Sequence, residues 1–266
     1  MDQPELQFLD VGSGPDRRRI AVLRDDGAEP GLVWLPGLKS DMVSTKASAL
    51  STFARERGLA CTRFDYSGHG QSGGRFEEGT IGRWLEEATA VVLGATRGPV
   101  ILVGSSMGGY ITLLLLRQLM SEAPAEAARI RGVVLIAPAW DMTERLMWQQ
   151  FPESVKQTIM TDGVWLRPSQ YGDPYALTRR LIEEGRNHLI GGQTWDPGRP
   201  VHILHGQLDP DVPWKHTLDL KSFLIGDRTR VTAVPDGDHR LSRPEDIDLL
   251  LRVVGEMVAG AANSSA

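Results

Sequence analysis

Short apolar runs recur along the chain, and segments with the spacing of amphipathic helices separate most of them. Most runs are continuously hydrophobic rather than alternating, which is typical of parallel strands covered on both faces. The first two runs flank the turn-forming residues 12–15, which predicts an antiparallel hairpin at the start of the sheet. The predicted strands cover residues 6–11, 18–24, 31–35, 60–65, 100–105, 133–137, 201–205 and 230–234.

Helices are predicted between most of these strands, over residues 44–57, 80–95, 108–120, 217–224 and 244–260. Strands that alternate with helices predict an α/β fold, with a doubly wound, mostly parallel, eight-stranded sheet and right-handed crossovers. Residues 98–116 carry no charge, but glycine, proline and serine interrupt them. We therefore expect a strand, a turn and a helix there rather than a membrane span.

The alternation of strands and helices is interrupted between residues 139 and 201. This interval has no convincing strand and is longer than one crossover helix needs. We predict a small helical cap at 140–198, inserted into a core formed by 1–139 and 199–266, with helical pieces at 143–150, 153–161 and 174–184. The alternative is a long, irregular crossover whose tryptophans fill the core.

Composition narrows the choice of partner and compartment. The formal net charge is −5, and the 29 basic residues are scattered among 34 acidic ones, which argues against nucleic acid or an anionic membrane. The single cysteine, Cys61, excludes an internal disulfide, and no Cys/His spacing is typical of a structural zinc site. The first residues lack the apolar core of a secretory signal, so we expect a cytoplasmic protein.

A candidate nucleophile lies between a predicted strand and a predicted helix. Residues 104–108 read Gly-Ser-Ser-Met-Gly and fit the pattern G-x-S-x-G, whose small residues let a strand and a helix pass closely around a strained serine. Ser106 occupies the nucleophile position. Ser105 does not, because the residue two positions before it is Val103.

A serine nucleophile needs a base, and the base needs a carboxylate that orients it. Asp209 follows one predicted strand and His239 follows the next, and these strand ends meet at one edge of such a sheet. We assign Asp209 as the carboxylate and His239 as the general base, with Asp211 and Asp141 as alternative acids. His205, directly at a strand end, is interpreted as structural.

An oxyanion hole requires two backbone N–H groups. One is expected from Met107, the residue after the nucleophile, and the other from Leu38 in the loop after an early strand. Gly37 would let that loop approach the substrate.

Residues 65–72 read Asp-Tyr-Ser-Gly-His-Gly-Gln-Ser and are similar to the D-x-x-G-x-G-x-S segment of α/β-hydrolases. Together with the motif around Ser106 and the turns at Asp209 and His239, this resemblance extends across most of the chain. Further matching segments resemble the branch that contains the mitochondrial palmitoyl-protein thioesterase and acyl-glucuronide esterase: 36–37, 40–42, 63–68, 104–109, 163–165, 212–214 and 238–240. The resemblance implies an α/β-hydrolase fold and the same triad.

The expected activity is cleavage of carboxylic esters or thioesters through an acyl-enzyme, on small molecules or acyl-proteins, without metal or organic cofactor. The tryptophan-rich insert suggests an apolar acyl or aromatic group, and we name Gly37, Trp140, Trp148 and Trp165 as substrate-binding candidates. Alternatives are other chemistry with the same triad, such as carbon–carbon bond hydrolysis, perhydrolysis or acyl transfer, or a ligand receptor without turnover. Acyl length, leaving group and the choice between monomer and homodimer are left open.

Overall fold

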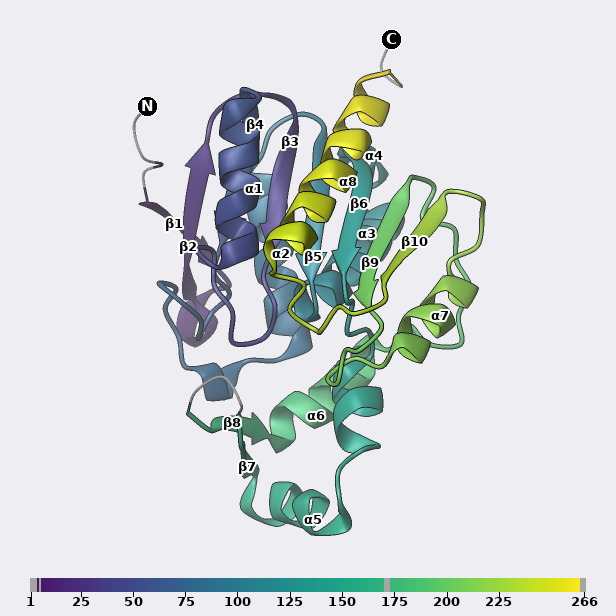
Figure 1. Cartoon of the computed structure of the whole chain (residues 1–266). Helices are drawn as coiled ribbons and strands as arrows, with labels where there is room; N and C mark the ends of the chain where they lie inside the picture. The colour runs from purple at the N-terminus through teal and green to yellow at the C-terminus, as the bar shows by residue number, and fades with distance from the viewer. Residues whose placement is uncertain (1–3, 5, 170–172, 264–266) are drawn as a thin grey trace.

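The computed structural model describes Pro4, residues 6–169 and residues 173–263 of the 266-residue chain. Its centre is an eight-stranded sheet in the order β1-β2-β4-β3-β5-β6-β9-β10 (Figure 1). The β1–β2 and β2–β4 pairs are antiparallel and all others are parallel, which confirms the predicted sheet and its initial hairpin. The strands are β1 (Leu6–Val11), β2 (Arg18–Asp25), β3 (Ala28–Leu35), β4 (Leu59–Phe64), β5 (Val100–Ser105), β6 (Ile130–Ile136), β9 (Val201–Gly206) and β10 (Thr229–Val234).

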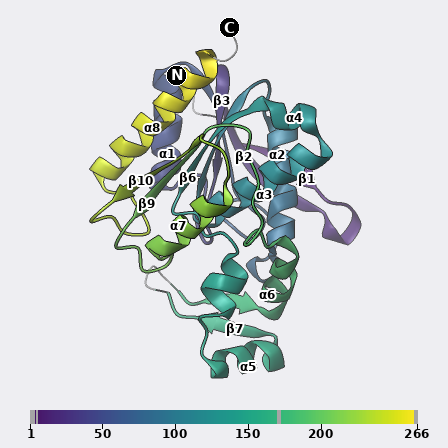
Figure 2. The ribbon, with the colours of Figure 1, turned by 90° about the vertical axis from the view of Figure 1, so that its right-hand side faces the viewer.

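Helices cover both faces of the sheet, as the continuous hydrophobicity of its strands requires. Figure 2 shows α1 and α8 together on one side and α2 and α3 on the other. The predicted helices all form, with ends within three residues of those expected: α1 (Thr45–Glu56), α2 (Ile81–Ala95), α3 (Met107–Glu122), α7 (Trp214–Phe223) and α8 (Pro244–Asn263). A short helix that the pattern did not predict, α4 (Pro124–Arg129), begins at a proline, which is tolerated in a first helical turn.

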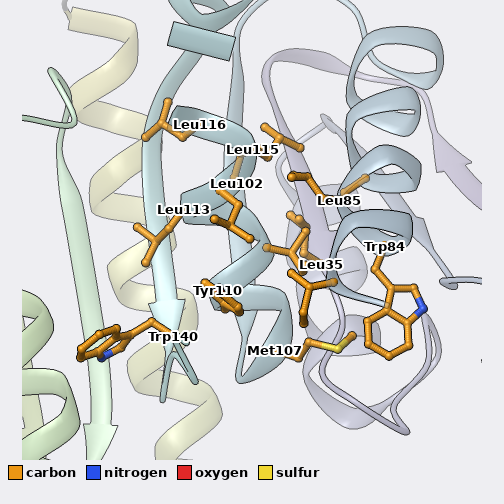
Figure 3. Close-up of a cluster of buried hydrophobic side chains, with 14 of the residues drawn as sticks. Leu35, Trp84, Leu85, Leu102, Met107, Tyr110, Leu113, Leu115, Leu116 and Trp140 are labelled. Carbon is orange, nitrogen blue, oxygen red and sulfur yellow. The ribbon is translucent and has the colours of Figure 1, made fainter. Parts of the chain in front are cut away.

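Two buried clusters result, one on each face of the sheet. Figure 3 shows part of the larger one, where Leu35 and Leu102 from the sheet meet Leu113 of α3 and Trp84 of α2. Burying each such leucine contributes about 1.5–3 kcal/mol. The second cluster joins α1 and α8 against the opposite face. None of the described helices is long and apolar enough to cross a membrane.

The segment between β6 and β9 lies beyond the ends of the central strands, below the sheet in Figure 1. It contains a π-helix (Met142–Trp148), α5 (Glu153–Asp162), an antiparallel pair of strands, β7 (Val164–Arg167) and β8 (Tyr175–Thr178), then α6 (Arg179–Gly185). The expectations of a helix from residue 174 and of no strand in this segment were therefore wrong. Thr178 begins the helix instead, because its hydroxyl accepts the Leu181 N–H as an N-cap.

Polar contacts hold the two ends of this segment together and join it to α2. Asp141 accepts the N–H groups of Ile190 and Gly191 at 2.8 and 2.9 Å. At α2, Glu184 accepts the Gly82 N–H, and its carboxylate lies 2.6 Å from the imidazole of His188. The division into a core and an inserted cap stays a prediction, and the Glu184–Gly82 contact joins the two parts.

His69 predicts a loss of stability in acid. Its side chain is 5% exposed, and burial lowers its pKa to about 4, below the ordinary value of 6.5. Between these values the unfolded chain binds a proton that the folded protein does not, so stability falls as pH decreases through this window. The loss from this group is at most about 3 kcal/mol. Urea unfolding at pH 7 and pH 4.5 should show a smaller difference for His69→Phe than for the wild type, and equal differences would contradict this origin.

Candidate active site

Ser106 lies in the turn between β5 and α3, with backbone angles φ 53° and ψ −116°. Such a conformation is strained for a residue with a side chain and persists only where its surroundings hold it. Here the Ser106 N–H donates to the Ile136 carbonyl at 2.8 Å, and the Ser106 carbonyl accepts the Tyr110 and Ala139 N–H groups. The neighbouring strand and the helix thus fix the turn from both sides.

The glycines on either side of Ser106 are required by space. A Cβ at Gly104 would lie 2.5 Å from the Gly108 carbonyl oxygen, and a Cβ at Gly108 would lie 2.0 Å from the Leu35 carbonyl oxygen. No side chain fits at those distances. The G-x-S-x-G pattern is therefore a steric consequence of passing α3 over the ends of β3 and β5.

Three predicted residues form one hydrogen-bonded chain. The Nε2 atom of His239 lies 3.0 Å from Ser106 Oγ, and its Nδ1 atom lies 2.7 Å from Asp209 Oδ2. Asp209 is buried, and its Oδ1 accepts the N–H groups of Asp211 and Val212 at 2.8 Å each. Because backbone donors hold the carboxylate, it can keep the imidazole in one orientation.

The two alternative acids occupy other places. Asp211 donates its N–H to Asp209 Oδ1, and its own side chain is exposed. Asp141 binds the backbone of the β6–β9 segment, as described above. The structure brings Asp209 to His239 and gives neither alternative acid a hydrogen bond to that imidazole among the described residues.

His205 lies directly behind Asp209. Its Nε2 is 2.9 Å from the Val212 carbonyl oxygen, and its Nδ1 is 2.6 Å from Thr217 Oγ1. The ring is fully buried, and burial lowers its pKa, so we expect it to be neutral at neutral pH. His205 thus braces the turn that carries Asp209, a role that fits its structural interpretation.

The residues predicted to form the oxyanion hole lie in or beside this turn. A Cβ at Gly37 would lie 3.4 Å from the Cβ of Ser106, so the loop that contains Leu38 passes directly beside the serine. Met107 begins α3, where backbone N–H groups lack partners within the helix. Asp65 steadies the loop by accepting the Met42 N–H at 2.7 Å. The use of the Leu38 and Met107 N–H groups as a hole stays a prediction.

A cavity of about 1060 Å³ opens at Ser106 and His239. Its apolar lining comes from several parts of the chain, most of which the sequence did not single out for substrate binding, and Gly37 also lines it. The apolar residues are Leu38, Met142, Leu146, Met147, Tyr175 and Val212. For Leu146 and Met147 the signal was only the apolar run 146–148, which gave no facing direction.

The predicted tryptophans are not on this cavity wall. Trp140 is fully buried in the core cluster of Figure 3, where its indole stacks on His216 and donates to the His216 carbonyl oxygen at 2.8 Å. Trp148 and Trp165 are half-buried, and Trp165 packs edge-on against Phe151. Trp140 is therefore withdrawn into the core, and the expectation that Trp148 and Trp165 bind substrate stays a prediction.

The side chains of Asp209, Asp211 and His239 also place potential metal-ligand atoms within 4.8 Å of one another. However, both oxygens of Asp209 already accept hydrogen bonds, and Nδ1 of His239 takes part in one of them. The hydrogen-bonded chain accounts for this cluster without a metal ion.

Known proteins share this architecture over nearly the whole chain. Residues 31–248 match the model of the alpha/beta hydrolase family. The human mitochondrial palmitoyl-protein thioesterase ABHD10 is 32% identical over 255 residues, which cover 95% of this chain and 80% of that protein. A structure described as a hydrolase from Agrobacterium vitis S4 has a TM-score of 0.93 and 42% identity, covering 97% of this chain and 100% of its own.

The mouse alpha/beta hydrolase domain-containing protein 10 is similar as well, with a TM-score of 0.83 and 29% identity over 96% of this chain and 99% of its own. The fold class, the match to the family model and these relatives agree. The chain belongs to the alpha/beta hydrolase family and, within it, is similar to the mitochondrial palmitoyl-protein thioesterase ABHD10.

Proposed function

We propose that this protein is a serine hydrolase that cleaves carboxylic esters or thioesters through an acyl-enzyme. The observation that carries the proposal is the hydrogen-bonded chain Ser106–His239–Asp209 at the wall of a large cavity. A serine, an imidazole and a fixed carboxylate in this order are the parts that acyl transfer needs.

In the first half-reaction, His239 Nε2 takes the proton of Ser106 as Oγ bonds to the carbonyl carbon of the substrate. Asp209 holds the Nδ1–H of the imidazole and stabilises the imidazolium that forms. The Leu38 and Met107 N–H groups would bind the oxyanion, and each such donor contributes about 3–4 kcal/mol to the transition state. His239 then protonates the leaving alcohol or thiol as its bond to the carbonyl carbon breaks.

In the second half-reaction, His239 removes a proton from water, whose oxygen attacks the acyl-enzyme. The bond to Ser106 Oγ breaks, His239 returns the proton to Oγ, and the carboxylic acid leaves. The buried, hydrogen-bonded Asp209 supports both halves, because the same imidazole must act as base and as acid in turn.

The apolar part of the cavity supports an acyl group as the portion that enters it. Met142, Leu146, Met147 and Val212 all line it. Flexible methionines accommodate varied chains. Palmitoyl-protein thioesterase is the name of the human relative, so acyl-proteins and acyl thioesters are the first substrates to test, with acyl glucuronides as a narrower candidate.

We also propose a cytoplasmic location, as expected from the sequence; the single cysteine, a buried free thiol, is compatible with that reducing compartment. The curated relatives are mitochondrial by name. Fractionation of cells that express the full chain checks this placement, and enrichment in an organelle fraction would contradict it.

A fluorophosphonate probe tests the nucleophile in the wild-type protein. We expect one labelled peptide, with the modification on Ser106, and turnover of matched oxygen esters and thioesters. From acetyl to octanoyl, kcat/KM should rise at least about tenfold, because each buried CH₂ contributes about 0.8 kcal/mol of binding. An unlabelled protein, or a label on another residue, would overturn the proposal. Labelling without hydrolysis of any ester would favour other chemistry with the same triad, and equal rates across chain lengths would overturn the apolar acyl site.

A further inference from the structure

The cavity has a second wall whose chemistry differs from the apolar one. It is formed by the end of β3, the start of α1 and the loop that follows His239. The residues are Trp34, Asp41, Ser44, Lys46, Arg240 and Ser242, here called the α1 wall. Except for the indole ring, these side chains are polar or charged, so this wall is unsuited to a hydrocarbon chain.

Two buried donors on the α1 wall have no partner within the described residues. The Trp34 side chain is 1% exposed, and its Nε1–H meets no acceptor there. The Ser44 hydroxyl oxygen is also buried without a hydrogen bond, although Ser44 is the N-cap residue of α1. Buried polar groups are nearly always satisfied, so unpaired donors beside a cavity point to an acceptor that a ligand supplies.

Positive charge gathers at the same place. Lys46 lies in the first turn of α1, where the backbone N–H groups and the helix dipole favour an anion. Its Nζ donates to the Arg240 carbonyl and to Ser242 Oγ, the latter at 3.2 Å, which leaves one of its three N–H groups for a ligand. Asp41 is the opposing charge on this wall, and its Oδ1 accepts the Val43 N–H at 2.9 Å.

The α1 wall lies next to the loop that carries His239. Arg240 directly follows His239, whose Nε2 delivers the proton to the departing atom in the proposed mechanism. Lys46 binds the carbonyl oxygen of that same Arg240. A substituent carried by the leaving group would therefore extend toward Lys46, while the acyl chain occupies the apolar side.

We propose that the α1 wall is a subsite for an oxyanion, a carboxylate or a phosphate, carried by the leaving group of the substrate. This inference rests on the proposed ester or thioester hydrolysis. Lys46 supplies the charge, while Trp34 and Ser44 donate hydrogen bonds that are unmade without the ligand.

Three thioesters that share the hexanoyl group and differ in the leaving group test the subsite. They are S-hexanoyl thioglycolate, its neutral amide, and S-hexanoyl 2-mercaptoethyl phosphate. For the wild type at pH 7 we expect kcat/KM to be at least tenfold higher for the carboxylate than for the amide. The phosphate arm shows which oxyanion is preferred. Lys46→Met should reduce the carboxylate preference to less than threefold, and Lys46→Arg should retain it. Lys215→Met is a matched control on α7, because Lys215 is exposed and pairs with Asp219 away from the cavity.

The pH dependence of the carboxylate preference tests whether the charge of Lys46, rather than the shape of its side chain, recognises the substrate. Burial and the neighbouring Arg240 lower the pKa of Lys46 to about 8, while the carboxylates of Asp238 and Asp246 oppose this shift. The carboxylate preference of the wild type should therefore decline above pH 8, whereas that of Lys46→Arg should persist to pH 10. Because both substrates use the same triad, effects of pH on the catalytic step cancel from the ratio.

Equal rates for the carboxylate and the amide in the wild type would overturn the subsite. It would also be overturned if Lys46→Met slowed both substrates equally, since Lys46 would then act by positioning the His239 loop. If no thioester is hydrolysed, the proposed function fails separately. Protection of Ser106 from fluorophosphonate by the carboxylate, compared with the amide, then decides the subsite alone.

Discussion

Replacing Ser106 with alanine is expected to lower kcat by about 10⁵–10⁶-fold, because removal of the nucleophile from a serine triad costs about that much. The change deletes one oxygen atom at a turn whose backbone is held by Ile136, Tyr110 and Ala139, so the fold should persist. Steady-state hydrolysis of the preferred ester checks the loss of kcat, and a thermal melt of the variant checks that the fold persists. Fluorophosphonate labelling should disappear completely.

Ser105→Ala is the matched control, since it removes the same atom from the adjacent residue. Ser105 ends β5, is 8% exposed and has no hydrogen bond to His239 among the described residues. We expect its activity to change less than about tenfold. A Ser106→Ala protein that keeps more than a hundredth of the wild-type rate would contradict the nucleophile assignment, and an equal loss in both variants would indicate a folding defect.

The sequence could predict the turn around Ser106 because both glycines that permit it, Gly104 and Gly108, lie two residues from the serine. Gly104 and Gly108 are needed at contacts with residues of the turn itself or of the adjacent strand, so the requirement is visible in the local pattern. The positions of Asp209 and His239 were predictable for a related reason. Parallel strands deliver their ends to one edge, and each residue follows the end of a strand with a strongly apolar run.

The side chains that line the cavity could not be predicted in the same way. Trp140 packs on His216, which is 76 residues further along the chain, and nothing in the local pattern selects that neighbour. Lys46 and Arg240 meet across 194 residues. Local sequence showed which residues were apolar or charged, whereas packing between distant elements decided which of them faced the cavity.

The strand pair β7–β8 was missed by the sequence analysis for a different physical reason. Each strand has four residues, too few for either the helical or the alternating period to be distinguished. In β7, Val164 and Leu166 are exposed while Trp165 is half-buried, so the alternation becomes clear only when exposure is known. Pairing with β8, through Trp165 and Leu177, stabilises the strand that the sequence alone left ambiguous.

Replacing Asp209 with asparagine is expected to lower kcat by about 10⁴-fold, with little change in KM. The amide retains the shape of the carboxylate, and its oxygen can still accept the N–H groups of Asp211 and Val212. Its NH₂ group, however, presents a donor to Nδ1 of His239. This favours the tautomer with the proton on Nε2, which cannot take the proton of Ser106. Steady-state kinetics across pH 6–9 would measure the loss.

The variant Asp211→Asn tests whether Asp209 or the alternative acid Asp211 orients His239. Asp211 has an exposed side chain and supplies only its backbone N–H to Asp209, so its activity should fall less than tenfold. Comparable losses of kcat in Asp209→Asn and Asp211→Asn would mean that both changes disturb the turn as a whole. A severe loss in Asp211→Asn alone would transfer the orienting role to that residue. The predicted contrast follows from the geometry, since Asp209 Oδ2 lies 2.7 Å from His239 Nδ1 and the Asp209 carboxylate is completely withdrawn from solvent.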